Sequence, residues 1–206
     1  MIEITTTCTS QAQARALLEA GADVLLIGEA DFSLRLPSSF SREAQADIVS
    51  LAHEYGKKVS VAVNAIMHPD DMKKIPEYLT FLDQIGVDRC VIGDPGVIYV
   101  LDELGLSIPF VYDGETMVTS ARQINFWGKK GAIGAVIARE VPFEELKMMA
   151  DQLEIFGEIL VYGPTCIHHS KRKLVRNFFS YIGAEESVGK ERGLFISEPE
   201  DPTTHY

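Results

Sequence analysis

Cysteine, long apolar stretches and basic residues are all scarce in this sequence. The three cysteines, Cys8, Cys90 and Cys166, are too few and too scattered for a disulfide framework, and no Cys-x-x-Cys pair predicts a zinc or redox motif. No stretch of about 18 apolar residues is available to form a membrane-spanning helix. The amino terminus lacks the basic start and the apolar run of a secretory signal. These absences predict a cytoplasmic protein with reduced cysteines.

Positive charge is also limited, because 19 Lys and Arg residues stand against 30 Asp and Glu residues, for a formal net charge of -11. Nucleic-acid binding by general electrostatic attraction depends on neutralising several phosphates, so it is not expected over the chain as a whole. One local exception is a cationic cluster made of Lys171, Arg172, Lys173 and Arg176. The cluster is either a solvated helix face or a local contact for RNA phosphate, and the sequence leaves both interpretations open.

Seven short runs rich in β-branched residues predict seven strands. They are Ile2–Thr5, Val24–Gly28, Val59–Asn64, Cys90–Asp94, Pro109–Asp113, Ala135–Ala138 and Ile159–Gly163. Most are apolar almost throughout, which is typical of parallel strands that are covered on both faces. Between them lie amphipathic segments predicted to be helices, four of which end at a glycine: Ser10–Ala20, Ser41–Tyr55, Asp70–Ile85, Ser120–Lys130 and Ser170–Tyr181.

A repeated strand–helix unit predicts an α/β protein, either a doubly wound sheet or a (β/α) TIM-type barrel. We favour the barrel, because no Gly-x-Gly-x-x-Gly follows the first strand and polar residues follow the strand ends. After the last predicted helix, only the short run Gly193–Ser197 is apolar. We therefore expect a barrel domain over residues 1–185 with the eighth strand absent or truncated. Residues 186–206 are expected to form an irregular tail or the start of a missing segment.

Polar residues follow the predicted strand ends, where the loops of a barrel build the active site. They are Glu29 and Arg35, Asn64 and His68, Asp94, Asp113 and Glu115, Arg139 and Glu140, and Cys166 with His168 and His169. Arginine suits bidentate capture of a carboxylate or phosphate, and nearby acids would orient the guanidinium groups. The alternation of arginine and acid therefore predicts a mixed-charge pocket for a small anion.

Two of these features have simpler alternative interpretations. Asp94 begins an Asp-Pro-Gly sequence that is typical of a turn, and His68 precedes a proline at a predicted helix start. The segment from Cys166 to His169 lacks the spacing of a zinc site, and adjacent histidines point in different directions. We therefore expect no metal site and no Cys–His nucleophile there.

Seven sequence blocks carry a family resemblance: Ala20–Gly28, Phe32–Arg35, Ala52–Lys58, Val63–Asn64, Gly93–Gly96, Ala138–Glu140 and Tyr162–Cys166. Together they resemble the collagenase-like peptidase family, peptidase family U32, over about the first 185 residues. That family's barrel agrees with the fold predicted above. The stretch from Thr165 to Gly183 is most similar to the smaller partner of a two-protein tRNA uridine 5-hydroxylation system in Gram-positive bacteria.

The resemblance implies a tRNA-modifying hydroxylation subunit that works in tRNA wobble-uridine 5-hydroxylation and binds a small carboxylate such as prephenate as hydroxyl source. A protease, that is, a hydrolase of peptide bonds, and a non-catalytic scaffold subunit are the alternatives. The family's second cysteine, about seven residues after the one matching Cys166, is replaced here by Lys173. Because an iron–sulfur cluster needs four thiolates, we expect none on this chain alone. The resemblance therefore implies a hetero-oligomer with a cysteine-complete relative.

The resemblance also implies roles for individual residues. We expect Arg35, Arg139 and Arg172 to hold the ligand's carboxylates, with Glu29, Asp94 and Glu140 orienting them. The expected catalytic residues are Asp94, Glu140 and Cys166, and the expected substrate-binding residues are Glu29, Arg35, Asn64, Glu115, Arg139, Ser170 and Arg172. The expected RNA contacts are Lys171, Lys173 and Arg176.

Overall fold

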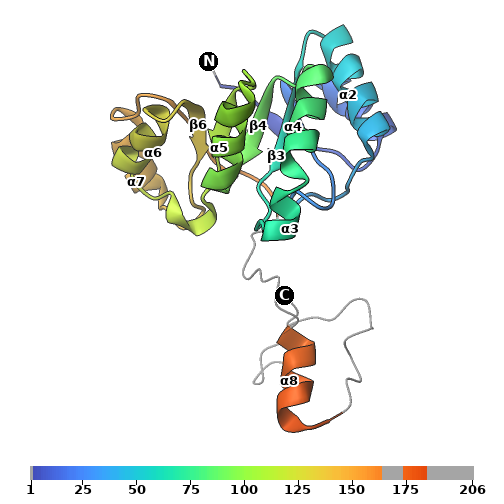
Figure 1. Cartoon of the computed structure of the whole chain (residues 1–206). Helices are drawn as coiled ribbons and strands as arrows, with labels where there is room; N and C mark the ends of the chain where they lie inside the picture. Colours follow the sequence, from blue (N-terminus) through green and yellow to red (C-terminus); the bar gives the residue numbers. More distant parts are fainter. Residues whose placement is uncertain (1, 164–173, 185–206) are drawn as a thin grey trace, which may run out of the picture. The chain divides into compact units, whose positions relative to one another are not determined.

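A computed structural model describes residues 2–163 and 174–184 of the chain, which divides into two compact units, 1–165 and 166–206. The first unit alternates strands with helices (Figure 1). The second is described by one helix, α8 (Leu174–Ile182). The predicted tail 186–206 lies outside the described residues.

Seven parallel strands form one sheet in the first unit. They are β1 (Thr5–Thr7), β2 (Val24–Ile27), β3 (Lys58–Val63), β4 (Arg89–Ile92), β5 (Phe110–Tyr112), β6 (Ala132–Val136) and β7 (Phe156–Glu158). Each strand pairs in parallel with the next in the sequence, in the order β1 to β7. A doubly wound sheet reverses its strand order at a switch point, whereas a barrel does not. The predicted barrel class is therefore confirmed, as an open sheet of seven strands among the described residues.

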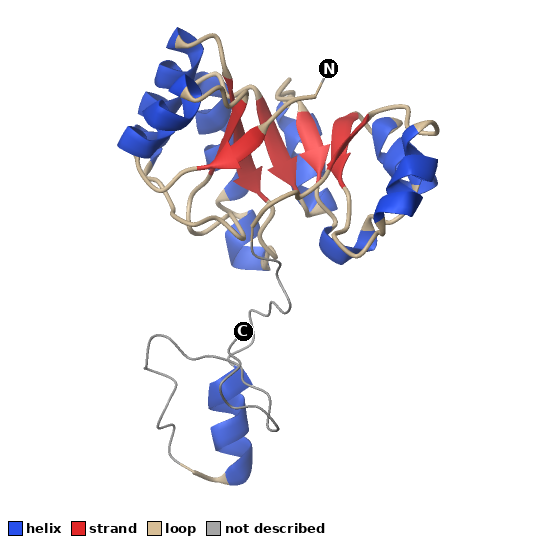
Figure 2. Ribbon diagram, turned by 180° about the vertical axis from the view of Figure 1, so that it is seen from behind, coloured by secondary structure: helices blue, strands red, loops and turns tan. Residues whose placement is uncertain are grey.

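Helices connect these strands and cover one face of the sheet. They are α1 (Gln11–Glu19), α2 (Arg42–Glu54), α3 (Pro69–Met72), α4 (Ile75–Gln84), α5 (Pro95–Leu104), α6 (Ala121–Gly128) and α7 (Phe143–Ala150), with a 3-10 turn η1 (Glu115–Met117). In Figure 1 helix α5 lies in front of the strands, and in Figure 2, seen from behind, no described helix covers them. The main core lies on the helix-covered face, where β-strand residues such as Ile27, Val61 and Ile92 are fully buried.

Serine side chains begin three of these helices as the sequence predicts. Ser10, Ser41 and Ser120 each accept a hydrogen bond from the backbone N–H three residues later. The helix expected over Asp70–Ile85 is instead two helices, α3 and α4. Pro76 lies in the first turn of α4, where its fixed φ and missing N–H are tolerated, so it favours the start of a second helix.

The first and last predicted strands are misplaced. The first strand, predicted at Ile2–Thr5, is β1 at Thr5–Thr7. Ile2 and Ile4 precede it and are exposed. The last is β7 at Phe156–Glu158, while the apolar run from Ile159 onward forms an exposed segment. The sequence Phe-Gly-Glu has little strand propensity, but an added Cβ at Gly157 would lie 2.7 Å from Ile137 Cδ1. Close packing, which the sequence pattern does not reveal, therefore selects that glycine in the strand.

The face of the sheet without helices carries charged side chains. Arg89 is 4% exposed and binds Glu3 through Nη2 and Oε1 at 2.7 Å, and its guanidinium carbon lies 5.3 Å from the ring centroid of Phe156. Glu158 lies near the same group, and burial raises the pKa of its carboxyl group, with Asp113 and Glu3 adding to the rise and Arg89 opposing it. The face of the sheet without helices therefore carries ionisable side chains.

A buried hydrogen-bonded chain fixes the loop after β2. Tyr78 Oη donates to Gln45 Oε1 at 2.9 Å, and Gln45 Nε2 donates to the carbonyl of Phe40 at 3.1 Å. The Phe32 ring stacks on Tyr78 with centroids 4.5 Å apart. Burial, with the nearby Glu29 carboxylate, raises the pKa of Tyr78 well above its usual value, so the hydroxyl stays neutral.

We expect Tyr78→Phe to lower the free energy of unfolding by about 1–3 kcal/mol, because the fully buried oxygen of Gln45 loses its donor. Chemical denaturation monitored by circular dichroism measures this loss. Tyr99→Phe, at a tyrosine that is 67% exposed, is the matched control and should stay within about 0.5 kcal/mol of the parent. Equal stability of the two variants would contradict the assignment.

We expect Glu158→Gln to raise the melting temperature near pH 7 but not near pH 4. A carboxyl whose pKa is raised on folding opposes folding only once pH exceeds its ordinary value of 4.5, where the unfolded chain ionises more readily. Melting curves across this range measure the difference, with exposed Glu154→Gln as control. A gain in melting temperature that is as large at pH 4 as at pH 7 would contradict this explanation.

Candidate functional site

Four polar residues from three strand ends form one network at the carboxyl edge of the sheet. Arg35 follows β2, Asn64 follows β3, and Asp113 and Glu115 follow β5. The Arg35 guanidinium binds Asp113 through Nη2 and Glu115 through Nη1, the latter at 2.5 Å. Residues about 80 positions apart in the chain therefore meet in one ion-pair cluster.

Asn64 ties the two sides of this cluster together. Its Nδ2 donates to Asp113 Oδ2 at 2.8 Å, and its Oδ1 accepts from the backbone N–H of Leu34 at 2.9 Å. The side chain is 7% exposed. Because one amide fixes both the carboxylate and the backbone next to Arg35, Asn64 sets the distance between them.

Asp113 is the fixed centre of the network. It is 2% exposed and accepts hydrogen bonds from Arg35, from Asn64 and from the backbone N–H of Glu115 at 3.1 Å. A buried carboxylate with several charge-assisted partners is held in one position. The sequence places Asp113 among the rim residues but predicts no site role for it. Its position as the last residue of a predicted strand was the signal that could have identified it.

The backbone at both ends of one ion pair is in the left-handed region. Arg35 has φ +60° and Glu115 has φ +56°, and within the described residues no other non-glycine residue has a positive φ. Each such residue costs about 1–3 kcal/mol, and such conformations cluster at functional sites. The ion pairs described above offset this strain.

Gly93 allows the end of β4 to lie against the network. A Cβ at this position would lie 3.0 Å from the carbonyl oxygen of Asp113 and 3.2 Å from that of Asn64. The next residue, Asp94, is the N-cap of α5, and its Oδ1 accepts from the Gly96 N–H at 2.7 Å. The turn interpretation therefore describes what the Asp94 side chain does here, and its expected catalytic role stays a prediction.

Glu29 does not orient Arg35 as expected. Its carboxylate lies 3.4 Å from Arg42 Nε, and Arg42 also binds Glu77 at 2.5 Å. The order of residues in the chain predicts that Glu29 pairs with Arg35, the next arginine, but Arg42 at the start of α2 lies beside Glu29 instead. Asp113 and Glu115 orient Arg35 instead.

Arg139 and Glu140 follow β6 at the same edge of the sheet. Arg139 is half-buried and has no hydrogen bond or ion pair within residues 2–163 and 174–184, while Glu140 is exposed. The preceding Ala138 N–H donates to the carbonyl of Val118 at 2.9 Å, which fixes the backbone there. Arg139 thus differs from Arg35 in having no carboxylate partner in the described part of the chain.

Other predicted site residues lie elsewhere. Cys166, Ser170, Lys171, Arg172 and Lys173 are outside the described residues. Arg176 is exposed on α8, in the second compact unit. His68 begins α3 as its N-cap, as predicted.

The two described cysteines are core residues. Cys8 and Cys90 are 1% and 0% exposed, and burial raises the pKa of their thiols to about 11 and about 12. Thiols that stay protonated at neutral pH are poor nucleophiles and poor metal ligands. Among the residues that the structure describes, no group of three His, Cys, Asp or Glu side chains is placed to hold a metal ion.

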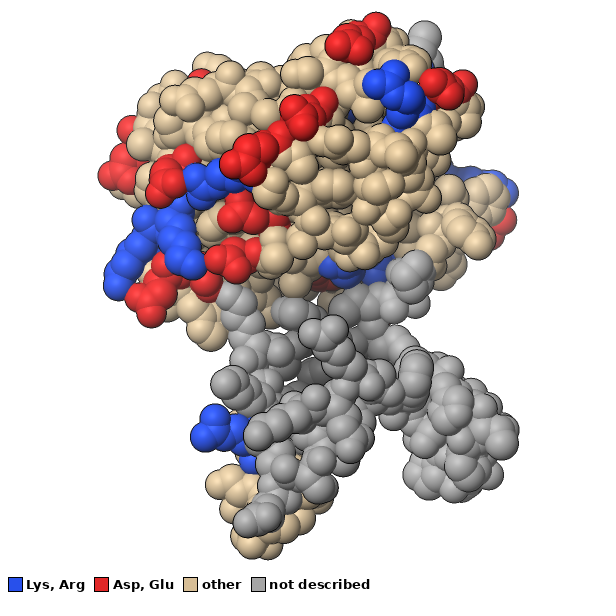
Figure 3. Space-filling view, turned by 90° about the vertical axis from the view of Figure 1, so that its right-hand side faces the viewer, with Lys and Arg blue, Asp and Glu red and all other residues tan. Residues whose placement is uncertain are grey.

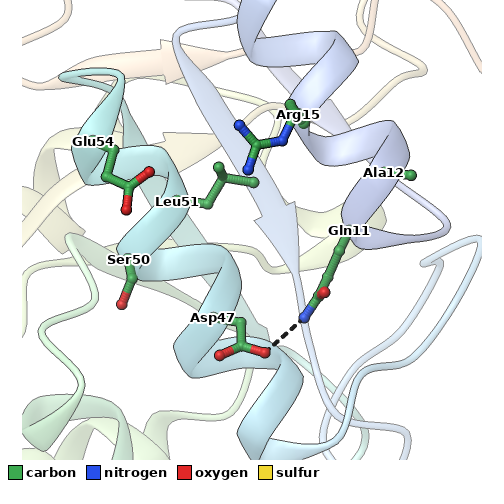
Figure 4. A pocket seen from close by; sticks show the side chains of 7 residues that line it. All are labelled: Gln11, Ala12, Arg15, Asp47, Ser50, Leu51 and Glu54. Carbon is green, nitrogen blue, oxygen red and sulfur yellow. Dashed lines mark hydrogen bonds between the residues drawn. The ribbon is translucent and has the colours of Figure 1, made fainter.

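A surface groove lies away from this network, between α1 and α2 (Figure 4). Gln11 bridges it by donating to Asp47 Oδ2 at 2.9 Å, and Arg15 and Glu54 also line it. The groove is formed by exposed polar residues on the outer helices and not by strand ends. It therefore lacks the buried, converging groups of the Arg35 network.

The face of the first unit shown in Figure 3 has no continuous basic area, because blue and red side chains lie next to one another. Within the first unit, Arg42 binds Glu77 and Lys74 binds Asp31, so these cations are paired with carboxylates of the chain. None of the helices in the described part of the chain has the length and apolar character needed to cross a bilayer.

Comparison with solved structures supports the barrel. The structure of the U32 peptidase Mk0906 superposes with a TM-score of 0.68 at 18% identity, covering 99% of this chain and 85% of that one. Salmonella typhimurium 3-hexulose-6-phosphate synthase gives a TM-score of 0.55 at 12% identity over 73% of this chain and 72% of that one. At these identities the likeness concerns the fold alone.

Relatives in sequence carry more information about function than the likeness in fold does. The chain is 40% identical to tRNA hydroxylation protein P2 of Bacillus subtilis over 201 residues, 96% of this chain and 65% of that protein. It is 27% identical to tRNA hydroxylation protein P1 of the same organism, over 76% of this chain and 37% of that protein. It is 28% identical to the 23S rRNA 5-hydroxycytidine C2501 synthase of Escherichia coli, over 82% of this chain and 25% of that protein.

This chain thus spans about two thirds of the P2 protein and less of the others. The sequence profile of peptidase family U32 matches residues 9–189, which is most of the chain. The resemblance predicted from seven short blocks is confirmed, and the chain belongs to peptidase family U32.

Proposed function

We propose that this protein is a subunit for tRNA wobble-uridine 5-hydroxylation, and that its strand-end pocket binds a small carboxylate such as prephenate. The observation that carries the proposal is the 40% identity to a tRNA hydroxylation protein over 96% of this chain. That identity extends across the strands and loops that build the Arg35 network. A second relative, at 28% identity, is named for hydroxylation of an rRNA cytidine, so nucleobase hydroxylation recurs among its relatives.

The arginines at the strand ends suit a carboxylate ligand. Arg35 already binds two carboxylates of its own chain, so its guanidinium is placed and oriented for this class of group. Arg139, half-buried at the same edge of the sheet, supplies a second cation. A charge-assisted hydrogen bond contributes about 1.5–3 kcal/mol, so two arginines would distinguish a dicarboxylate from a neutral analogue.

An iron–sulfur cluster, which the family resemblance implies for cysteine-complete members, does not fit this chain. It has three cysteines, and two of them are buried core thiols with raised pKa values. Four thiolates are needed. We therefore propose a partner chain with a complete cysteine set, and relatives named P1 and P2 in one organism are consistent with such a pair.

Peptide hydrolysis and a purely structural role are the competing functions. For a cysteine peptidase the described part of the chain offers only Cys8 and Cys90, and both are buried. His53, a potential base, binds Asp88 at 3.0 Å on the outer surface. A structural subunit does not require Arg35 and Glu115 in strained conformations, so the network favours a ligand site.

RNA contact through Lys171, Lys173 and Arg176 is part of the proposal. Arg176 is exposed on α8, and the first unit offers no continuous basic area on the face shown in Figure 3. Phosphate contacts position an RNA without reading its sequence. The local cationic cluster would therefore supply the attraction that an acidic chain otherwise lacks.

Mass spectrometry of tRNA nucleosides from a strain that lacks this protein tests the proposal. We expect loss of 5-hydroxyuridine derivatives, restored by the wild-type chain and by Arg122→Ala, which changes an exposed arginine of α6. Arg139→Ala should restore about a tenth or less of the modification, because loss of one charge-assisted contact costs about 1.5–3 kcal/mol of ligand binding. An unchanged nucleoside profile in the deletion strain would overturn the proposed function.

A further inference from the structure

The two carboxylates on Arg35 differ in how far they are buried. Asp113 is 2% exposed and receives three hydrogen bonds, from Arg35, Asn64 and the Glu115 backbone. The Glu115 side chain is 37% exposed and binds the other terminal nitrogen of Arg35, Nη1. The inner carboxylate is therefore a fixed part of the protein, whereas the outer one faces solvent.

The Glu115 carboxylate lies on a short turn at the surface of the first unit. Glu115 begins the short turn η1, and Met117 in the same turn is 72% exposed. On the other side, a Cβ at Gly114 would lie 2.9 Å from the Tyr112 ring, so the chain before Glu115 is closely packed. The φ of +56° at Glu115 is in the left-handed region, which is costly for a residue other than glycine.

Charge explains why displacement is needed. Arg35 with Asp113 and Glu115 has more negative than positive charge, so an added anion would meet net repulsion while both carboxylates remain. If the ligand carboxylate replaces Glu115 on Nη1, the number of carboxylates on the guanidinium does not change. Exchange with Glu115 would therefore let an anion bind Arg35 without added repulsion.

We infer that Glu115 occupies the place of the substrate carboxylate on Arg35 and acts as a built-in competitor that lowers the affinity for every carboxylate ligand, so that only a ligand with further contacts binds well. A tethered side chain has a high effective concentration, so a ligand with one carboxylate competes poorly. A dicarboxylate also binds a second cation at the same edge, with Arg139 the candidate, and it overcomes the competition. This inference rests on the carboxylate site of the proposed function.

Isothermal titration calorimetry with succinate and butyrate, at fixed ionic strength, tests the inference on the full chain. The two acids have equal length and differ by one carboxylate. Wild-type protein should bind succinate in preference to butyrate. Glu115→Gln should bind both acids about fivefold tighter, the change expected when a partly exposed ion pair no longer competes. Because either acid must displace Glu115 from Arg35, the two gains should be similar, and the preference for succinate, which depends on the second cation, should persist.

Glu103→Gln, at an exposed glutamate of α5, is the matched control and should leave both affinities unchanged. If Glu115→Gln does not fold, Glu115→Gly takes its place, because glycine lacks the carboxylate and suits a positive φ. Affinities equal to or below wild type in these variants, or no binding of either acid to any of the proteins, would overturn the inference.

The result is separable from that of the nucleoside experiment. Loss of 5-hydroxyuridine in the deletion strain without any gain in the Glu115 variants would remove this inference and leave the proposed function. A gain in the variants with an unchanged nucleoside profile would remove the proposed function and retain the competitor role.

Discussion

The ion pair between Arg35 and Asp113 is the interaction on which the rest of the site depends. It joins the loop after β2 to the end of β5, across the two strands between them, and it places a guanidinium beside a carboxylate that is 2% exposed. Asn64 maintains the spacing by bonding both Asp113 and the backbone beside Arg35. The left-handed backbone at Arg35 and Glu115 persists because these contacts offset its cost.

The apolar core and the charged side chains lie on different faces of the sheet. The helix-covered face of the sheet holds the apolar core, and the other face carries Arg89, Glu158 and the Arg35 network. A family named for peptidases thus presents in this chain a network of ion pairs at the strand ends, with no nucleophilic cysteine beside it among the described residues. The family assignment follows from the sequence profile, whereas the activity must be argued from the site, since one fold supports many functions.

Much of the fold could be predicted from the sequence, because apolar runs identify strands that are buried on both faces. The runs at Val24 and Val59 were placed within one residue of β2 and β3. Prediction failed at β7, where close packing selects Gly157, and at the single helix expected over Asp70–Ile85. At the site, strand ends identified Arg35, Asn64 and Glu115. Their pairing could not be predicted, since Arg42, far from the strand end, takes the carboxylate expected for Arg35.

A double-mutant cycle on the free energy of unfolding, with Arg35→Met and Asp113→Asn singly and together, tests the central claim most directly. We expect the two losses not to add, with a coupling energy of about 1–3 kcal/mol, because Arg35→Met leaves buried Asp113 without its counter-charge, and Asp113→Asn removes one of the two carboxylates on Arg35. Losses that add to within about 0.5 kcal/mol would show that the two side chains do not act on each other, and would contradict the account.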